Sequence, residues 1–214
     1  MPDAEAPLSI PRMNSANYGA MEIREHWLTG VARVPSPNCS ERAATDDISL
    51  LVIHNISLPP GEFGGPHIDE LFCNRLDATA HPYFAGIWEL RVSSHVLIRR
   101  DGTVVQYVPF DRKAWHAGRS VYEGRAECNE YSIGIELEGS DDTEFTAVQY
   151  EQLTAITRLL LQHYPAVSAA RITGHSDIAP GRKTDPGPHF DWARYFQALQ
   201  HSQTASAGQA LPGV

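Results

Sequence analysis

The sequence has few of the features that mark membrane-spanning, secreted or nucleic-acid-binding proteins. No uninterrupted apolar stretch approaches the roughly 18 to 20 residues that crossing a bilayer needs, which excludes an integral membrane protein. Lys and Arg number 17 against 26 Asp and Glu, the formal charge is −9, and no basic block stands out. Sequence-independent binding to nucleic-acid phosphates is therefore not expected. The first residues lack the basic and apolar regions of a secretory signal, which predicts a cytoplasmic protein.

Cysteine and the common hydrolase motifs are also scarce. The three cysteines, Cys39, Cys73 and Cys128, are odd in number and far apart, which is typical of reduced thiols. They form no CxxC pair, so a cysteine-based zinc site has little support. No GxSxG occurs, and no cysteine lies in a nucleophile motif, which argues against a serine or cysteine hydrolase.

The composition that remains describes one globular domain. The chain has 214 residues, of which 42% are hydrophobic, enough to bury a sizeable core. Small and polar residues dominate both ends, which predicts a flexible extension over residues 1–25 and a disordered tail over residues 201–214. Residues 26–200 are expected to form the folded domain.

Hydrophobic periodicity predicts alternating strands and helices along this domain. An apolar, β-branched run predicts a buried strand, two runs joined by Asp-Gly predict a hairpin, and a run that alternates predicts a further strand. Apolar residues at helical spacing behind a Thr146 capping box predict the longest helix. The expected strands are residues 48–54, the hairpin 95–108, 132–138 and 171–173, and the expected helices are 68–72, 146–164 and 190–199. This order predicts an α/β fold, a single domain with a central mixed β-sheet flanked by helices.

Histidine is the most informative residue type here, because imidazole both binds metals and titrates near neutrality. His54 ends the first predicted strand, His175 follows the last one, and Asp185 lies ten residues further on. Two imidazoles and one carboxylate would make a three-ligand zinc site with an open position for water. Spacing alone does not decide, since there is no HExxH, and a lone histidine at a strand end is more often structural.

Two further charged residues are candidates for catalysis. Glu136 lies on the polar face of the strand at 132–138, and on an antiparallel strand such a face is normally solvated. Alternatively, Gly134 leaves room beside Glu136 for a substrate, and a partly desolvated Glu136 exchanges a proton with a water. Lys183 could place a positive charge beside a developing oxyanion, although a lone lysine is more often on the surface.

Residues 26–199 closely resemble the zinc N-acetylmuramoyl-L-alanine amidases, a family related to the peptidoglycan recognition proteins. The resemblance is highly specific, because long stretches match in the right order. Among them are LLVIHNISLPPGEFGGP (50–66), RVSSHVLIRRDGTVVQYVPFD (91–111), AWHAG (114–118), CNEYSIGIELEG (128–139) and TGHSDIAPGRKTDPGP (173–188).

The resemblance implies a role for each candidate residue. It makes His54, His175 and Asp185 the ligands of one Zn²⁺, Glu136 the catalytic acid/base and Lys183 the stabiliser of the transition state. Many relatives have a tyrosine before the histidine of the first hairpin strand and a non-acidic residue on the later strand. Here those positions are Ser94 and Glu136, as in the branch that cuts 1,6-anhydro-muropeptides during cytoplasmic peptidoglycan recycling.

The implied substrate is a muropeptide, cut between the lactyl carbonyl of (1,6-anhydro-)N-acetylmuramic acid and L-alanine. Candidate substrate contacts are Asn55 through hydrogen bonds, Arg91 through a carboxylate clamp and Trp115 through its flat ring, each with an ordinary structural alternative. His95 and His116 are expected to be structural or to orient ligands. We expect a monomer with no nucleic-acid or membrane partner. A non-catalytic muropeptide-binding module and an exported amidase acting on polymeric peptidoglycan remain the alternatives.

Overall fold

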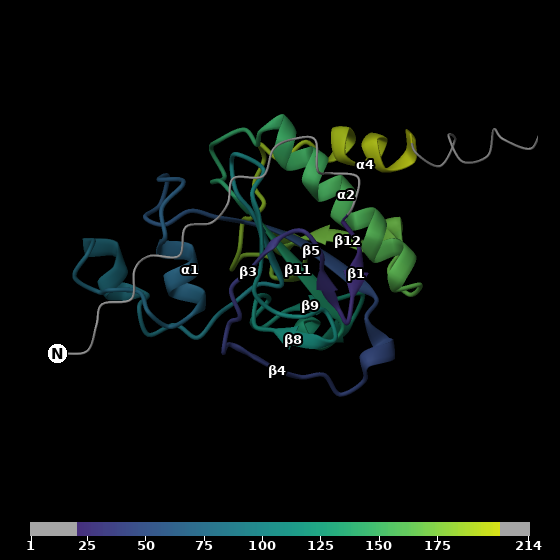
Figure 1. Ribbon diagram of the computed structural model, residues 1–214, viewed down its shortest axis with the longest axis horizontal. Coiled ribbons are helices and arrows are strands. Elements are labelled where there is room, and N and C mark those ends of the chain that lie inside the picture. Colours follow the sequence, from purple (N-terminus) through teal and green to yellow (C-terminus); the bar gives the residue numbers. More distant parts are fainter. Residues whose placement is uncertain (1–20, 202–214) are drawn as a thin grey trace, which may run out of the picture.

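One strand that is buried along its whole length organises the fold. This strand is β11 (Ser132–Glu138), and it pairs in parallel with β5 (Leu50–Ile56) on one side and with β6 (Val96–Ile98) on the other. In the computed structural model, which describes residues 21–201, these strands lie at the centre of a six-stranded mixed sheet in the order β12-β5-β11-β6-β7-β3. The predicted α/β fold with a single domain is confirmed (Figure 1).

The remaining elements are short. The other strands are β1 (Ile23–Arg24), β2 (Trp27–Leu28), β3 (Ala32–Arg33), β4 (Cys39–Glu41), β7 (Val104–Gln106), β8 (Arg112–Ala114), β9 (Val121–Tyr122), β10 (Arg125–Ala126) and β12 (Ile172–Gly174). The α-helices are α1 (His67–Phe72), α2 (Ala147–His163), α3 (His175–Ile178) and α4 (Trp192–His201), and 3₁₀ turns lie at Thr45–Asp47, Pro82–Gly86, Cys128–Glu130 and Ala169–Arg171. Within residues 21–201, no helix is long and apolar enough to span a bilayer.

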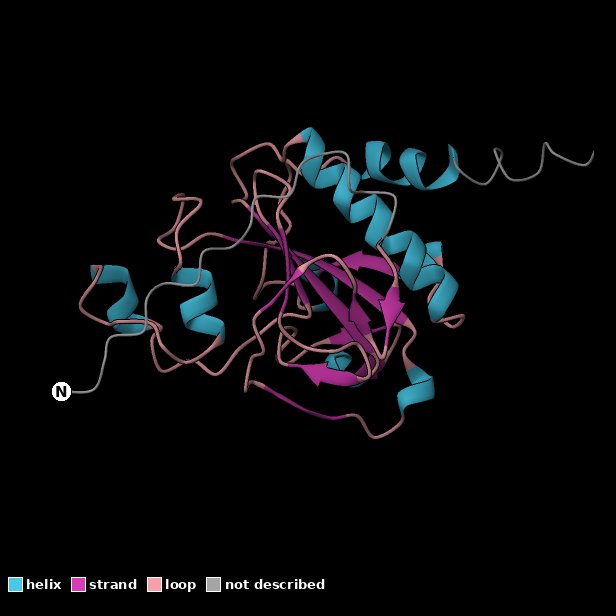
Figure 2. Ribbon diagram, viewed as in Figure 1, coloured by secondary structure: helices cyan, strands magenta, loops and turns pink. Residues whose placement is uncertain are grey.

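Helices α2 and α4 lie together against one face of the sheet (Figure 2). The odd-numbered residues of β11, such as Ile135, point into this layer and pack with α2 residues such as Leu153 and Ile156. Thr146 caps α2 in the predicted capping box with Gln149, and Asp191 accepts a hydrogen bond from the Arg194 amide at the start of α4. The opposite face of β11 carries its even-numbered residues and is left for the site.

The predicted hairpin, the α2 helix and the β11 strand are confirmed, but two expectations about the strands are wrong. Strand β5 does not end at His54, because pairing with β11 continues for two more residues, to Ile56. Strand β11 is not antiparallel with one solvated face, because parallel neighbours flank it and all seven of its residues are buried.

The predicted ends of the domain fall largely outside the described residues. Of the expected extension, residues 21–25 are described, and β1 within them pairs with β2 in a short antiparallel hairpin. Of the expected tail, only residue 201 is described. The domain limits at 26 and 200 stay predictions.

Candidate metal centre and active-site cleft

His54 and Glu136 lie side by side at the carboxyl end of two parallel strands. The register of β5 and β11 places His54 directly opposite Glu136. Since side chains alternate along a strand, both point to the face opposite α2. The carboxyl ends of parallel strands are the usual place for ligands in α/β sheets, because connecting loops gather there.

His175 reaches the same edge from the neighbouring strand. It follows β12, which pairs with β5, and it is the first residue of α3. The Asp177 carboxylate accepts hydrogen bonds from the Gly174 amide and the Thr173 hydroxyl, both at 3.0 Å, and these bonds fix the turn that carries His175.

Asp185 belongs to the loop that follows α3. The Asp185 carbonyl accepts a hydrogen bond from the Ser176 amide at 2.9 Å. Arg182 in the same loop donates hydrogen bonds to the carbonyls of Ala117 and Arg119 at 2.6 and 2.8 Å. These bonds hold the loop against the sheet edge and direct the Asp185 carboxylate at the two histidines.

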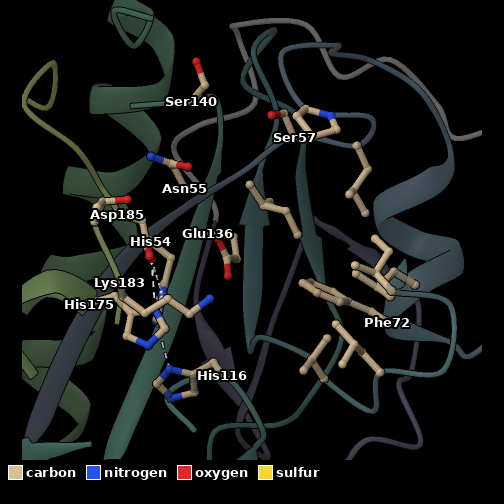
Figure 3. A pocket seen from close by; sticks show the side chains of 18 of the residues that line it. His54, Asn55, Ser57, Phe72, His116, Glu136, Ser140, His175, Lys183 and Asp185 are labelled. Carbon is tan, nitrogen blue, oxygen red and sulfur yellow. Dashed lines mark hydrogen bonds and ion pairs between the residues drawn. The ribbon is translucent and has the colours of Figure 1, made fainter. Parts of the chain in front are cut away.

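The structure brings the three predicted ligands together (Figure 3). The Nδ1 atoms of His54 and His175 are 3.0 Å apart, and Asp185 Oδ2 lies 2.9 Å from the first and 3.0 Å from the second. Tetrahedral zinc with bonds of about 2.0 to 2.1 Å holds its ligand atoms about 3.3 to 3.4 Å apart. The triangle is therefore close to the size that such an ion requires.

The donor chemistry also fits a divalent cation. His175 Nε2 lies 3.1 Å from the Ala117 carbonyl, which only accepts, so Nε2 carries the proton and Nδ1 presents a lone pair. Burial lowers the pKa of His54 to about 4, so this imidazole is neutral at pH 7. Burial alone would raise the pKa of Asp185, but the contacts with His175 and His54 lower it below its usual value. Two imidazoles and one carboxylate form a ligand set that Zn²⁺ accepts, with a fourth position left open.

Glu136 is a buried carboxyl group with spare bonding capacity. Its exposed fraction is 8%, and its Oε2 atom has no hydrogen-bond partner among the described residues. Burial raises the pKa of Glu136 well above its ordinary value, the Asp185 charge raises it further, and Lys183 acts in the opposite direction. A carboxyl group with a raised pKa in a cleft suits proton transfer near neutral pH.

The raised pKa of Glu136 predicts how the stability of the metal-free protein depends on pH. A carboxyl whose pKa is higher in the folded state favours folding at low pH, and this contribution is lost as pH rises through the folded pKa. Glu136→Gln cannot ionise. We therefore expect its melting temperature to match the wild type near pH 4 and to exceed it increasingly toward pH 8, measured by thermal denaturation in chelator. A difference that does not change with pH would contradict the raised pKa.

The remaining predicted site residues lie around one cleft of about 610 Å³, except Arg91. Lys183, Asn55 and Trp115 line it, and the Lys183 side chain extends toward the space beside Glu136 (Figure 3). Asn55 donates hydrogen bonds to Asp141 and to the Pro186 carbonyl, and Trp115 donates to Ser40. Arg91 is exposed, donates to the Glu89 carbonyl, and is not among the residues that line the cleft.

The expectation that Gly134 leaves room for a substrate is wrong. A Cβ atom at Gly134 would lie 2.5 Å from the imidazole ring of His116, so that ring fills the space. The histidine in the AWHAG segment is the signal that could have pointed to this contact.

Sequence reasoning also missed one wall of the cleft. This wall is apolar and faces the metal centre across the cleft. It is formed by Leu58, Leu71, Phe72, Tyr83, Ile87, Leu90 and Val92. Tyr83 and Leu90 are 45% and 47% exposed, so part of this wall is open to solvent, and such exposure is not visible in a sequence.

Comparison with known proteins assigns this site to a family. The sequence profile of the family described as N-acetylmuramoyl-L-alanine amidase matches residues 44–188, which include all three candidate ligands and Glu136. The chain belongs to the N-acetylmuramoyl-L-alanine amidase family. Within this amidase family, the chain is 62% identical over 179 residues to the 1,6-anhydro-N-acetylmuramyl-L-alanine amidase AmpD of Citrobacter freundii, covering 84% of this chain and 95% of that protein.

Solved amidase structures are similar as well. A crystal structure of a selenomethionine AmpD derivative has a TM-score of 0.82 and 60% identity, and the match covers 84% of this amidase chain and 99% of that chain. The amidase AmiD of Escherichia coli, solved with anhydro-N-acetylmuramic acid-L-Ala-D-γ-Glu-L-Lys, has a TM-score of 0.54 and 26% identity, covering 89% of this chain and 72% of that one.

Proposed function

We propose that this chain is a zinc-dependent amidase that hydrolyses the bond between 1,6-anhydro-N-acetylmuramic acid and L-alanine in muropeptides released during peptidoglycan recycling in the cytoplasm. One observation carries the proposal. Three ligand atoms converge within 3.0 Å of one another beside a buried carboxyl oxygen that has no partner among the described residues. The relatives named AmpD and the AmiD complex with an anhydromuropeptide support the choice of substrate.

The cleft has two chemically different ends that suit the two halves of this substrate. The metal-ligand end is polar and would receive the scissile amide. The opposite, apolar wall provides flat and aliphatic surface, including the exposed Tyr83 and Leu90, for the less polar faces of a sugar ring. A volume of about 610 Å³ is typical for a small-molecule site.

In the mechanism, His54, His175 and Asp185 would hold the metal. A Zn²⁺ ion bound there would supply a water of pKa near 7 and the Lewis acidity that polarises an amide carbonyl. Glu136 accepts the proton of the attacking water at its free Oε2 and later delivers it to the leaving nitrogen of L-alanine. The Lys183 side chain extends toward the space beside Glu136 (Figure 3), so it would place its ammonium group beside the carbonyl oxygen as negative charge develops there.

The role of Lys183 in stabilising the oxyanion can be tested by substitution. We expect Lys183→Met to lower kcat by about 10² to 10³, which is typical for removing one group that stabilises a developing oxyanion. Lys183→Arg should retain part of the activity, because it keeps the charge. Steady-state kinetics of both variants measures the effect, and a Lys183→Met enzyme with the kcat of the wild type would remove this role.

The proposed substrate and cofactor can be tested together. Purified protein is assayed on anhydro-muramyl tripeptide and, in parallel, on intact sacculi, with release of peptide from the sugar followed by mass spectrometry. We expect rapid cleavage of the tripeptide compound and little release from sacculi. Efficient release from sacculi would favour the exported amidase, and binding of the tripeptide without cleavage would favour the non-catalytic module.

The metal requirement gives a separate prediction. Treatment with a strong chelator should abolish cleavage of the tripeptide compound, because both the water and the carbonyl lose their polarising ion. Added Zn²⁺ should restore activity, with one equivalent bound per chain. Activity that persists in protein shown to be metal-free would contradict the zinc mechanism.

A further inference from the structure

His116 connects the candidate metal centre to the interior of the protein. Its ring lies against β11 in the space left by Gly134, and its exposed fraction is 8%. His116 Nδ1 lies 2.9 Å from His54 Nε2, and its own Nε2 lies 3.1 Å from the Ser132 hydroxyl. The Ser132 hydroxyl lies 2.6 Å from the Cys128 carbonyl. Four groups therefore form an unbroken chain from a backbone carbonyl to a candidate metal ligand, and Figure 3 shows its last link, from His116 to His54.

The chemistry of the chain decides which atoms carry the protons. A carbonyl only accepts hydrogen bonds, so the single hydroxyl hydrogen of Ser132 must point at Cys128. The Ser132 oxygen then accepts from His116, which places a proton on His116 Nε2 and leaves Nδ1 as an acceptor. His54 must therefore donate to His116 from its Nε2, and its Nδ1 keeps a free lone pair.

This placement of protons leaves the lone pair of His54 on the atom that faces the other candidate ligands. Nδ1 is the atom of His54 that lies within 3.0 Å of both His175 Nδ1 and Asp185 Oδ2. We propose that His116 and Ser132 are positioning residues that hold His54 in its Nε2–H form and so direct its Nδ1 lone pair at the zinc ion. This inference rests on the zinc site of the proposed function and adds two residues that do not touch the ion.

Residues 116–117 also orient His175, the second candidate histidine ligand. The Ala117 carbonyl accepts from His175 Nε2, and the amides of His116 and Ala117 both donate to Asn129 Oδ1, at 3.2 and 2.8 Å. The pair of residues 116–117 therefore sets the proton position on both imidazole ligands, one through a side chain and the other through a backbone carbonyl. Partners of this kind fix the ring orientation and basicity of metal-bound histidines.

The proposal predicts graded losses of zinc affinity. In His116→Leu the acceptor for His54 Nε2–H is removed, and we expect zinc to bind about 10- to 100-fold more weakly. In His116→Asn the side-chain oxygen can take the place of Nδ1, so most of the affinity should return. Ser132→Ala should give an intermediate loss. Ser94→Ala is the matched control, because Ser94 is an equally buried serine that donates only to backbone carbonyls, and it should bind zinc like the wild type.

Zinc affinity is measured by competition with a chromophoric chelator, with near-UV circular dichroism as the check on folding. A role in packing alone would not be rescued by Asn, so equal losses in His116→Leu and His116→Asn overturn the proposal, as does unchanged affinity in His116→Leu. If His116→Leu does not fold, the contrast between Ser132→Ala and Ser94→Ala decides. Long-range ¹H–¹⁵N spectra of the zinc-loaded wild type should show His116 protonated at Nε2. Protonation of His116 at Nδ1 instead would overturn the proposal. A wild type that binds no zinc would instead refute the proposed function.

Discussion

Glu136→Gln should lower the turnover of anhydro-muramyl tripeptide by a factor of about 10² to 10⁴, which is the usual contribution of a positioned acid/base. The amide nitrogen of glutamine replaces an oxygen that can accept a proton, while the size of the side chain is nearly unchanged. Because Glu136 is not one of the three candidate ligands, zinc content should stay at one ion per chain. Kinetics together with metal analysis of the same preparation measures both quantities.

The design of this experiment separates loss of chemistry from loss of structure. Glu151→Gln makes the same substitution at an exposed position on α2, and it should leave kcat, zinc content and stability unchanged. A Glu136→Gln enzyme that turns over at a rate near that of the wild type would refute the assignment of Glu136 as the proton-transfer group.

His54→Ala should have a still larger effect, because it removes both metal binding and catalysis. The loss leaves His175 and Asp185 as the remaining candidate ligands, whereas a catalytic zinc site is typically held by three protein ligands. We expect no zinc after dialysis, and turnover lower than that of Glu136→Gln, since neither an activated water nor a polarised carbonyl remains. Metal analysis and an overnight assay with product detection by mass spectrometry measure the two losses.

Exposed His189 supplies the matched substitution for this test. His189→Ala should retain its zinc and its turnover. If His54→Ala kept stoichiometric zinc, the ion would have to be held elsewhere, and the triangle of His54, His175 and Asp185 would no longer explain it.

Local patterns were sufficient to predict much of the fold. The Asp-Gly hairpin and the Thr146 capping box are each specified by neighbouring residues, and the structure contains both. The direction of β11 was not predictable in this way. Whether a strand has parallel or antiparallel neighbours depends on crossover connections of tens of residues, which leave no mark on the strand's own alternation.

The site likewise has features that the sequence predicts and features that depend on the packing of distant segments. The types of residue and their family resemblance pointed to His54, His175 and Asp185, and the structure places these three together. The resemblance did not reveal that the His116 ring occupies the space at Gly134, because this contact depends on how two loops and a strand pack. Nor did it reveal that Arg91 does not line the cleft, since exposure is a property of the folded chain.

The pairing of His54 with Glu136 across two adjacent strands also limits how this protein can vary. Adding or deleting one residue within either strand would turn every following side chain to the other face and separate Glu136 from His54. Exchange of one aliphatic residue for another in these strands has a much smaller effect on the site, because the hydrogen-bonded register of the two strands does not change. Changes in chain length during evolution should therefore be confined to the connections between strands, where an insertion alters the rim of the cleft without disturbing its chemistry.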